Sequence, residues 1–158
     1  MVVTLVVLLM PTYARVRGAL ARAQGERLVY LARATALGIP GDSLIAGARA
    51  HDLIRRARVE NADVLGDGNG LVSVELVGRD STDRYHMLVN SDRESLASTL
   101  WSPADHLDRA VSAGRAAATG VYETGLDKVL SAAAPIFQGK RVVGAVVITG
   151  RVDGLLAE

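Results

Sequence analysis

The pattern of hydrophobic and polar positions changes its period once along the chain. Up to about residue 58, apolar residues recur every three or four positions, which is typical of helices that pack by one face. From about residue 71 onward, apolar and polar residues alternate or form short valine-rich runs, which is typical of β-strands. The pattern therefore predicts an α+β fold with two helices followed by a sheet.

The first helix is predicted to begin at Pro11, since proline is tolerated in a first turn, and to end before Gly38 and Pro40. A stripe with alternating three- and four-residue spacing runs along it. Its members are Tyr13, Val16, Leu20, Ala23, Arg27, Tyr30, Ala34 and Leu37. A heptad stripe of this kind packs on a sheet or pairs with a second copy of the same helix, and the sequence favours neither.

Residues 2–10 form an uninterrupted run that is apolar except for Thr4. A bilayer span needs roughly 20 residues, and the run lacks the basic region and cleavage site of a signal peptide. We interpret it as the outer end of a transmembrane helix that begins before this chain. The alternative is an ordinary buried strand or the start of a helix.

A second helix is predicted from Asp42 or Ser43, either of which can cap it, to about Arg58. Five strands follow over 71–77, 84–89, 118–123, 128–136 and 142–148. Connections from the third strand on are short, which predicts antiparallel neighbours. In the last hairpin Gly139 supplies the positive φ of a tight turn, and Gly144 is a small residue of the kind found where a second backbone approaches closely.

Residue types needed for catalysis or metal binding are scarce. The chain has no cysteine, its three histidines fall in separate predicted elements, and its serines lack a nucleophile-elbow motif. The glycine-rich segment 66–70 lacks both the acidic ligands of a calcium loop and the lysine of a phosphate loop. We therefore expect no catalytic residue, no metal site and no cofactor, and interpret the segment as an exposed turn.

Charge is unevenly distributed although the net charge is only +1. Nine arginines lie in residues 1–58, against Glu26, Asp42 and Asp52, so the helical part is basic. Aromatic residues, which stack on nucleic-acid bases, make up only 4% of the chain. We interpret the arginines as solvated helix faces and membrane-proximal charge, and expect no nucleic-acid partner.

The most specific motif is the last hairpin. Three alanines, Pro135, Ile136, a glycine-containing turn and the run from Arg141 to Ile148 resemble the last hairpin of Cache-type (PAS-like) extracytoplasmic sensor domains of bacterial receptors. Residues 119–122 followed by 129–131 are similar to that family's preceding strand pair, and residues 39–42 to its helix-to-helix joint. The resemblance covers most of residues 15–148.

The resemblance implies a five-stranded antiparallel sheet with the long first helix and the second helix packed on one face. It implies a ligand-sensing, non-enzymatic domain of a histidine kinase, chemoreceptor or cyclic-nucleotide enzyme, located in the periplasm as part of an inner-membrane protein. Residues 1–10 would then end a transmembrane segment, 11–150 form the sensor, and 151–158 lead to a second span. A homodimer through the first helix is expected. The alternative is a ligand-free PAS-like module for dimerisation or partner binding.

The resemblance also places a ligand pocket beneath the connection 90–114. Trp101, the only tryptophan, is the lid candidate in that connection, although a lone tryptophan also commonly anchors a loop. Residues expected to contact a ligand are Arg84, His86, Trp101, Arg115, Tyr122 and Ser131. An arginine and a histidine on one strand face can hold a carboxylate, but an edge strand with a polar outer face explains Arg84 and His86 equally well.

The predicted site departs from that of organic-acid sensors of this family in two ways. Those sensors place their arginine and histidine three residues apart, whereas Arg84 and His86 are two apart. Residues 132–134, all alanine, leave the fourth strand without basic residues. A neutral or apolar ligand, or no ligand at all, therefore stays open.

Overall fold

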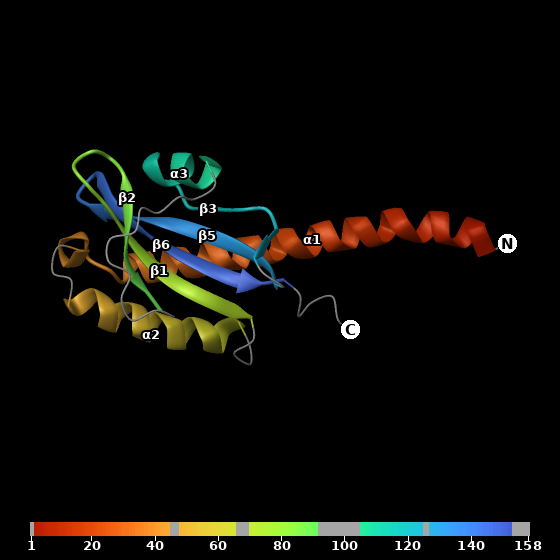
Figure 1. The fold of residues 1–158 in the computed structure, drawn as a ribbon, viewed down its shortest axis with the longest axis horizontal. Coiled ribbons are helices and arrows are strands. Elements are labelled where there is room, and N and C mark those ends of the chain that lie inside the picture. Colours follow the sequence, from red (N-terminus) through yellow and green to blue (C-terminus); the bar gives the residue numbers. More distant parts are fainter. Residues whose placement is uncertain (1, 45–47, 66–69, 92–104, 125–126, 153–158) are drawn as a thin grey trace.

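An antiparallel sheet has two helices on one face and a third, short helix on the other (Figure 1). The computed structural model describes residues 2–44, 48–65, 70–91, 105–124 and 127–152. The helices are α1 (Val2–Leu37), η1 (Gly41–Leu44, a 3-10 turn), α2 (Ala48–Leu65) and α3 (Asp105–Ser112). The strands are β1 (Leu71–Arg79), β2 (Tyr85–Asn90), β3 (Ala117–Ala118), β4 (Tyr122–Thr124), β5 (Asp127–Gln138) and β6 (Arg141–Arg151).

The strand order is β2-β1-β6-β5-β3, and β4 pairs with the start of β5. Every pairing is antiparallel, which confirms the predicted fold class. The sheet has six strands rather than five because the third predicted strand is divided. Thr119 still bonds to Ser131, its amide donating to the Ser131 carbonyl at 2.7 Å, but the exposed Gly120 leaves the ladder and pairing resumes at Tyr122.

Both long helices differ in extent from the prediction. α1 does not begin at Pro11 but at Val2, and it continues through the proline. A proline inside a helix removes one backbone hydrogen bond, and the neighbouring residues continue the helix on both sides. α2 begins at Ala48 and extends to Leu65 rather than to about Arg58, since no glycine or proline interrupts residues 59–65.

The core on the α1 and α2 face is formed by alternate residues of the central strands, including Leu130 and Ile136 of β5 and Val146 and Ile148 of β6. α1 contributes a buried face to this core, formed by Leu28, Leu31, Ala32 and Ala36. That face is not the heptad stripe. Tyr30 and Leu37 of the stripe are 71% and 89% exposed, so the sheet-packing interpretation of the stripe is wrong.

The core on the opposite face lies under α3. Leu107 and Val111 of α3 are buried against Ala133 of β5 and Val147 of β6. Successive residues of β5 and β6 therefore point to opposite faces of the sheet, except at the bulge near Ile136 and Phe137, where Val142 joins the α3-side core.

Two glycine interpretations from the sequence are confirmed. Gly139 has a φ of 61° in the β5–β6 turn. Gly144 of β6 pairs with Gly78 of β1, and a Cβ added to Gly144 would stand 2.3 Å from the Val77 carbonyl oxygen and 2.9 Å from Leu44 Cδ1. Only a residue without a side chain fits between the two.

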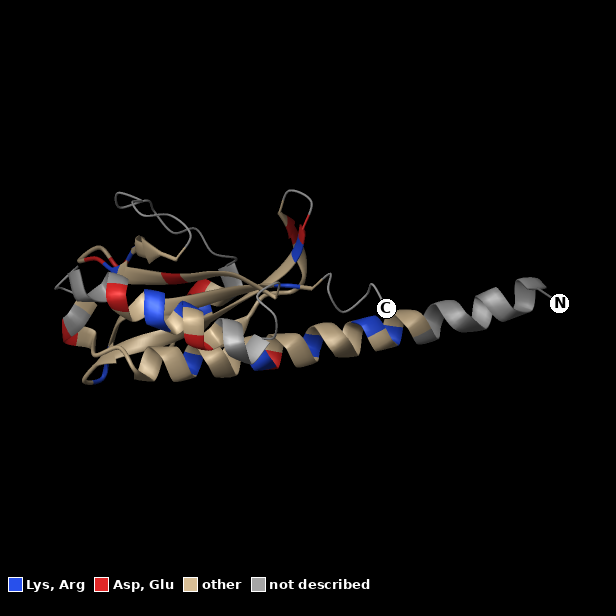
Figure 2. Cartoon of the chain, turned by 90° about the horizontal axis from the view of Figure 1, so that it is seen from below, with Lys and Arg blue, Asp and Glu red and all other residues tan. Residues whose placement is uncertain are grey.

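α1 projects beyond the end of the sheet at which β6 also ends (Figures 1 and 2). Basic positions recur along α1 from its projecting part to the part that packs on the sheet (Figure 2). No helix in the described part of the chain is both long and apolar enough to cross a bilayer.

Candidate functional site

The predicted ligand-binding residues lie in three separate places. Arg84 and His86 lie at the β1–β2 turn, Tyr122 and Ser131 lie on β4 and β5, and Arg115 follows α3. Trp101, the lid candidate, lies outside the described residues. The structure therefore brings together Tyr122 with Ser131 and Arg84 with His86, but it does not bring these pairs together with each other or with Arg115.

The β1–β2 turn is organised by the carboxylate of Asp80. Its Oδ1 accepts hydrogen bonds from the Thr82 amide (2.7 Å), the Thr82 hydroxyl (2.8 Å) and the Arg84 amide (3.0 Å). Its Oδ2 accepts one from His86 Nε2 at 2.7 Å. The Arg84 amide, followed by the Thr82 hydroxyl and His86, holds the pKa of Asp80 well below its usual range.

His86 and Arg84 thus already donate hydrogen bonds to a carboxylate of the chain itself, that of Asp80. His86 donates to Asp80 through its ring, whereas Arg84 does so through its backbone. A cavity of about 600 Å³ borders this turn and is lined also by Leu88 and Arg141. The turn thus holds the His86 ring in a structural hydrogen bond and uses Arg84 through its backbone, and the contact of either side chain with a ligand stays a prediction.

A cluster of hydroxyl groups lies on the α3 face of the sheet. The Tyr122 hydroxyl is 2.6 Å from Ser131 Oγ, which is 2.7 Å from Thr149 Oγ1. The Ser131 amide donates to Thr119 Oγ1 at 3.0 Å. We call Tyr122, Ser131 and Thr149 the hydroxyl cluster. Ser131 and Thr149 lie two residues from Ala133 and Val147 of the α3-side core, so they share that face of the sheet.

The cluster continues laterally across the sheet. Ser73 of β1 pairs with Thr149, and Thr149 pairs with Ser131, so three buried hydroxyl residues stand side by side on adjacent strands. A hydroxyl group both donates and accepts, so such a row can turn its protons to suit either kind of polar group. Tyr122, 42% exposed, connects the buried row to the surface.

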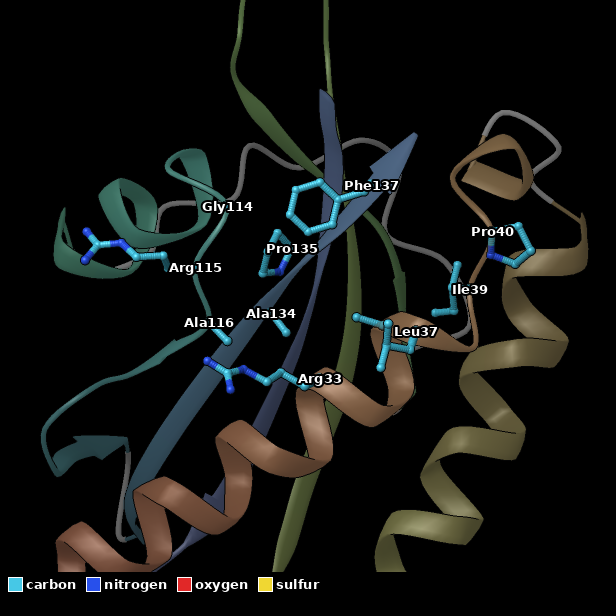
Figure 3. A pocket seen from close by; sticks show the side chains of 11 residues that line it. Arg33, Leu37, Ile39, Pro40, Gly114, Arg115, Ala116, Ala134, Pro135 and Phe137 are labelled. Atoms are coloured by element: carbon cyan, nitrogen blue, oxygen red, sulfur yellow. The ribbon is translucent and has the colours of Figure 1, made fainter. Parts of the chain in front are cut away.

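Arg115 lines a different cavity, of about 470 Å³, between the C-terminal end of α1 and β5 (Figure 3). Arg33 of α1 lines the same cavity. Arg33 was not selected from the sequence. The first helix carries several arginines, and each of them was interpreted as part of a solvated helix face. The position of Arg33 one turn before the end of the helix, next to the joint at Gly38, was the available signal.

The described residues contain no group of three or more His, Cys, Asp and Glu side chains arranged to hold a metal ion. The described titratable groups form pairs and turns instead, such as Arg151 with Asp127 at 3.0 Å and Arg79 with Asp83 at 3.3 Å.

No protein-family model matches the chain, and no curated protein matches it in sequence. Solved structures match in fold. The sensory domain of the Campylobacter jejuni chemoreceptor Tlp3 superposes with a TM-score of 0.57 at 13% identity, covering 89% of this chain and 58% of that one. The ligand-binding domain of the Pseudomonas aeruginosa amino acid chemoreceptor PctC, in complex with GABA, superposes with a TM-score of 0.51 at 14% identity. This match covers 93% of this chain and 63% of that one.

The chain thus spans less than two thirds of the length of either structure. Both neighbours are sensory domains of chemoreceptors, and the chain shares their fold. This agrees with the fold expected from the resemblance to Cache-type sensor domains.

Proposed function

We propose that this chain is the extracytoplasmic ligand-sensing domain of a bacterial transmembrane signalling receptor. One observation carries the proposal: α1 has two apolar faces, of which one packs on the sheet and the other, the heptad stripe, is exposed. A helix that served only the domain core would need one apolar face. The fold shared with chemoreceptor sensory domains supports the same conclusion.

The exposed stripe pairs with the stripe of a second copy in this proposal. Its spacing is that of a coiled-coil seam, and its side chains are exposed except for the half-buried Leu20, with Tyr30 and Ala34 lying beside α2. A ligand bound to the sheet then shifts the population between two arrangements of the paired helices, by as much as its affinities for them differ. The domain itself has no catalytic part in this scheme.

The ligand contacts the hydroxyl cluster on the α3 face of the sheet. Tyr122 and Ser131 are both predicted ligand-binding residues, and their side-chain oxygen atoms lie 2.6 Å apart on this face. The row of buried hydroxyl groups offers uncharged hydrogen-bond donors and acceptors. The chemistry fits a small, polar, uncharged group on the ligand. PctC was solved with the small molecule GABA, which supports ligand binding by this fold. Trp101 stays the predicted lid.

The membrane lies at the end of the sheet from which α1 projects. The apolar residues 2–10 continue the α1 helix away from the sheet, and β6 ends on the same side, so both connections lead in one direction (Figure 1). In this arrangement the sensor occupies the periplasm and residues 151–158 lead toward a second span. The arginines of α1 then face the membrane surface and the solvent.

A thermal-shift screen of small metabolites tests the proposal. We expect at least one neutral polar compound to raise the unfolding temperature of the wild type. Ser131→Ala and Tyr122→Phe should weaken that compound about three- to tenfold each, because each removes a hydrogen bond worth about 0.5–1.5 kcal/mol. Arg84→Ala, at the distant β1–β2 turn, serves as the control and should leave the affinity unchanged.

A compound that binds all four proteins equally would place the ligand site elsewhere. If no metabolite binds the wild type, a ligand-free dimerisation module is the better account of the exposed stripe.

A further inference from the structure

The cavity between α1 and β5 has an apolar floor. Ala36, at the end of α1, and Ile39, just after it, are both buried, and Ala134 and Pro135 come from β5. Phe137, the only phenylalanine of the chain, is 47% exposed at its rim. A half-exposed phenylalanine beside a hollow is apolar surface that a ligand can cover.

The cavity lies on an edge of the sheet. β3 pairs only with Ala132 and Ala133, so from Ala134 onward no described strand lies beside β5 on this side. Gly114, with a φ of 72°, turns the chain after α3 and leaves room for the Phe137 ring, which lies 3.3 Å from the position of an added Cβ. Within the described part of the chain, the missing neighbour strand of β5 and the turn at Gly114 therefore leave the cavity uncovered.

Two guanidinium groups border this apolar floor. Arg33 and Arg115 are both exposed, and neither guanidinium group has an ion pair or hydrogen bond to a residue that the structure describes. The Arg33 side chain extends over the floor toward Ala116, whereas the Arg115 guanidinium points outward from the rim (Figure 3). An exposed arginine changes rotamer easily, so Arg115 can turn over the opening.

The net charge at the cavity is positive. The carbonyl end of α1 contributes the equivalent of roughly half a negative charge, less than the two full charges of the guanidinium groups. Guanidinium binds a carboxylate through two parallel hydrogen bonds, a geometry that an ammonium group cannot reproduce. The cavity volume of about 470 Å³ lies within the usual range for small-molecule sites.

We propose that this cavity binds a small carboxylate with an apolar body, such as an aryl or medium-chain aliphatic acid. Arg33 holds the carboxylate, Arg115 closes over it, and the apolar body lies on Ala134, Pro135 and Phe137. This site is separate from the hydroxyl cluster, and it stands or falls independently of the sensor function proposed above.

Isothermal titration with phenylacetate and hexanoate tests the site, with phenylacetamide as the uncharged counterpart. We expect both acids to bind the wild type and the amide to bind at least tenfold more weakly. Arg33→Gln and Arg115→Gln should each weaken phenylacetate roughly ten- to hundredfold, the loss expected for a hydrogen bond to a charged group. Arg55→Gln, an exposed arginine of α2 away from the cavity, is the matched control and should bind like the wild type.

Two further variants separate charge from shape. Arg33→Lys keeps the charge but loses the planar fork, so it should bind between the wild type and Arg33→Gln. Ala116→Leu adds bulk at the cavity wall and should weaken binding with both arginines intact. Failure of both acids to bind the wild type, equal binding of the amide, or undiminished binding by either glutamine variant would overturn the two-arginine site.

Discussion

Asp80 accepts four hydrogen bonds within one turn, and this makes the β1–β2 turn sensitive to acid. The pKa of Asp80 in the folded protein lies well below its ordinary value, chiefly because the Arg84 amide donates to the charged carboxylate. A depressed folded pKa means that the stabilisation is fully present above the ordinary pKa, near 4, and is lost as the pH falls toward the folded value.

We therefore expect the unfolding temperature of the wild type to fall more steeply below about pH 4 than that of Asp80→Asn, which has no carboxylate to protonate. At neutral pH the same variant should be the less stable of the two. Thermal unfolding followed by circular dichroism from pH 7 to pH 3 measures both effects. Asp108→Asn, at an exposed position of α3, is the control and should follow the wild type. Parallel profiles for wild type and Asp80→Asn would contradict the assignment.

The pairing of Tyr122 with Ser131 was accessible from the sequence, because both lie on predicted strands joined by a short turn. The role of Asp80 was not, since it lies in a polar loop and its partners meet only when the turn closes. Arg33 was not recognised for a related reason: residues 33 and 115 become neighbours of one cavity only through the packing of α1 against the β5 edge. Contacts between exposed side chains far apart in the sequence produce no periodic pattern of hydrophobic and polar positions.

The contact of β1 with β6 depends on one missing side chain. The space that a Cβ of Gly144 would take is filled by the Val77 carbonyl oxygen of β1 and by Leu44 of η1, so the glycine lets a strand and a turn approach the same point. A backbone oxygen cannot move aside without breaking ladder hydrogen bonds on both sides of the contact.

Gly144→Ala should lower the free energy of unfolding by about 1–3 kcal/mol, or more where the backbone cannot shift. Gly120→Ala is the matched control, because an added Cβ there meets no atom within 4 Å, and it should be neutral or stabilise by up to about 1 kcal/mol. Urea denaturation of both variants measures the difference. Equal stability of the two would mean that β1 and η1 rearrange at little cost.

At the level of elements, the sequence reasoning was most successful for the last hairpin, where the turn chemistry and the valine-rich runs agree. It was least successful at element ends. Pro11 suggested a helix start, but helix formers on both sides continue α1 through it. The third strand was predicted as one piece because Gly120, at which it divides, lies within an otherwise strand-like segment.

Two copies of the whole molecule should associate through the heptad stripe of α1. These 158 residues have no cysteine, so within them a single cysteine introduced at Leu20 or Ala23 can bond only with the same cysteine of a second copy. Both positions lie on the stripe, and we expect disulfide-linked dimers of the full-length protein in membranes under mild oxidation. Arg22→Cys, exposed but off the stripe, is the control and should crosslink far less. Absence of dimers at both stripe positions, or equal crosslinking at Arg22, would argue against this pairing.

The length of α1 has one more mechanical consequence. Among residues 13–37 of α1, whose burial the structure describes, the first buried residue is Gly25. Val2 lies 23 positions earlier, which at 1.5 Å per residue amounts to about 35 Å of helix. As a rigid rod, this part of α1 would transmit a tilt like a lever, with the packing of Leu28 and Leu31 on the sheet as its fulcrum. A tilt of only about 3° at the fulcrum moves the far end by about 2 Å, the size of the helix displacements that switch protein interfaces.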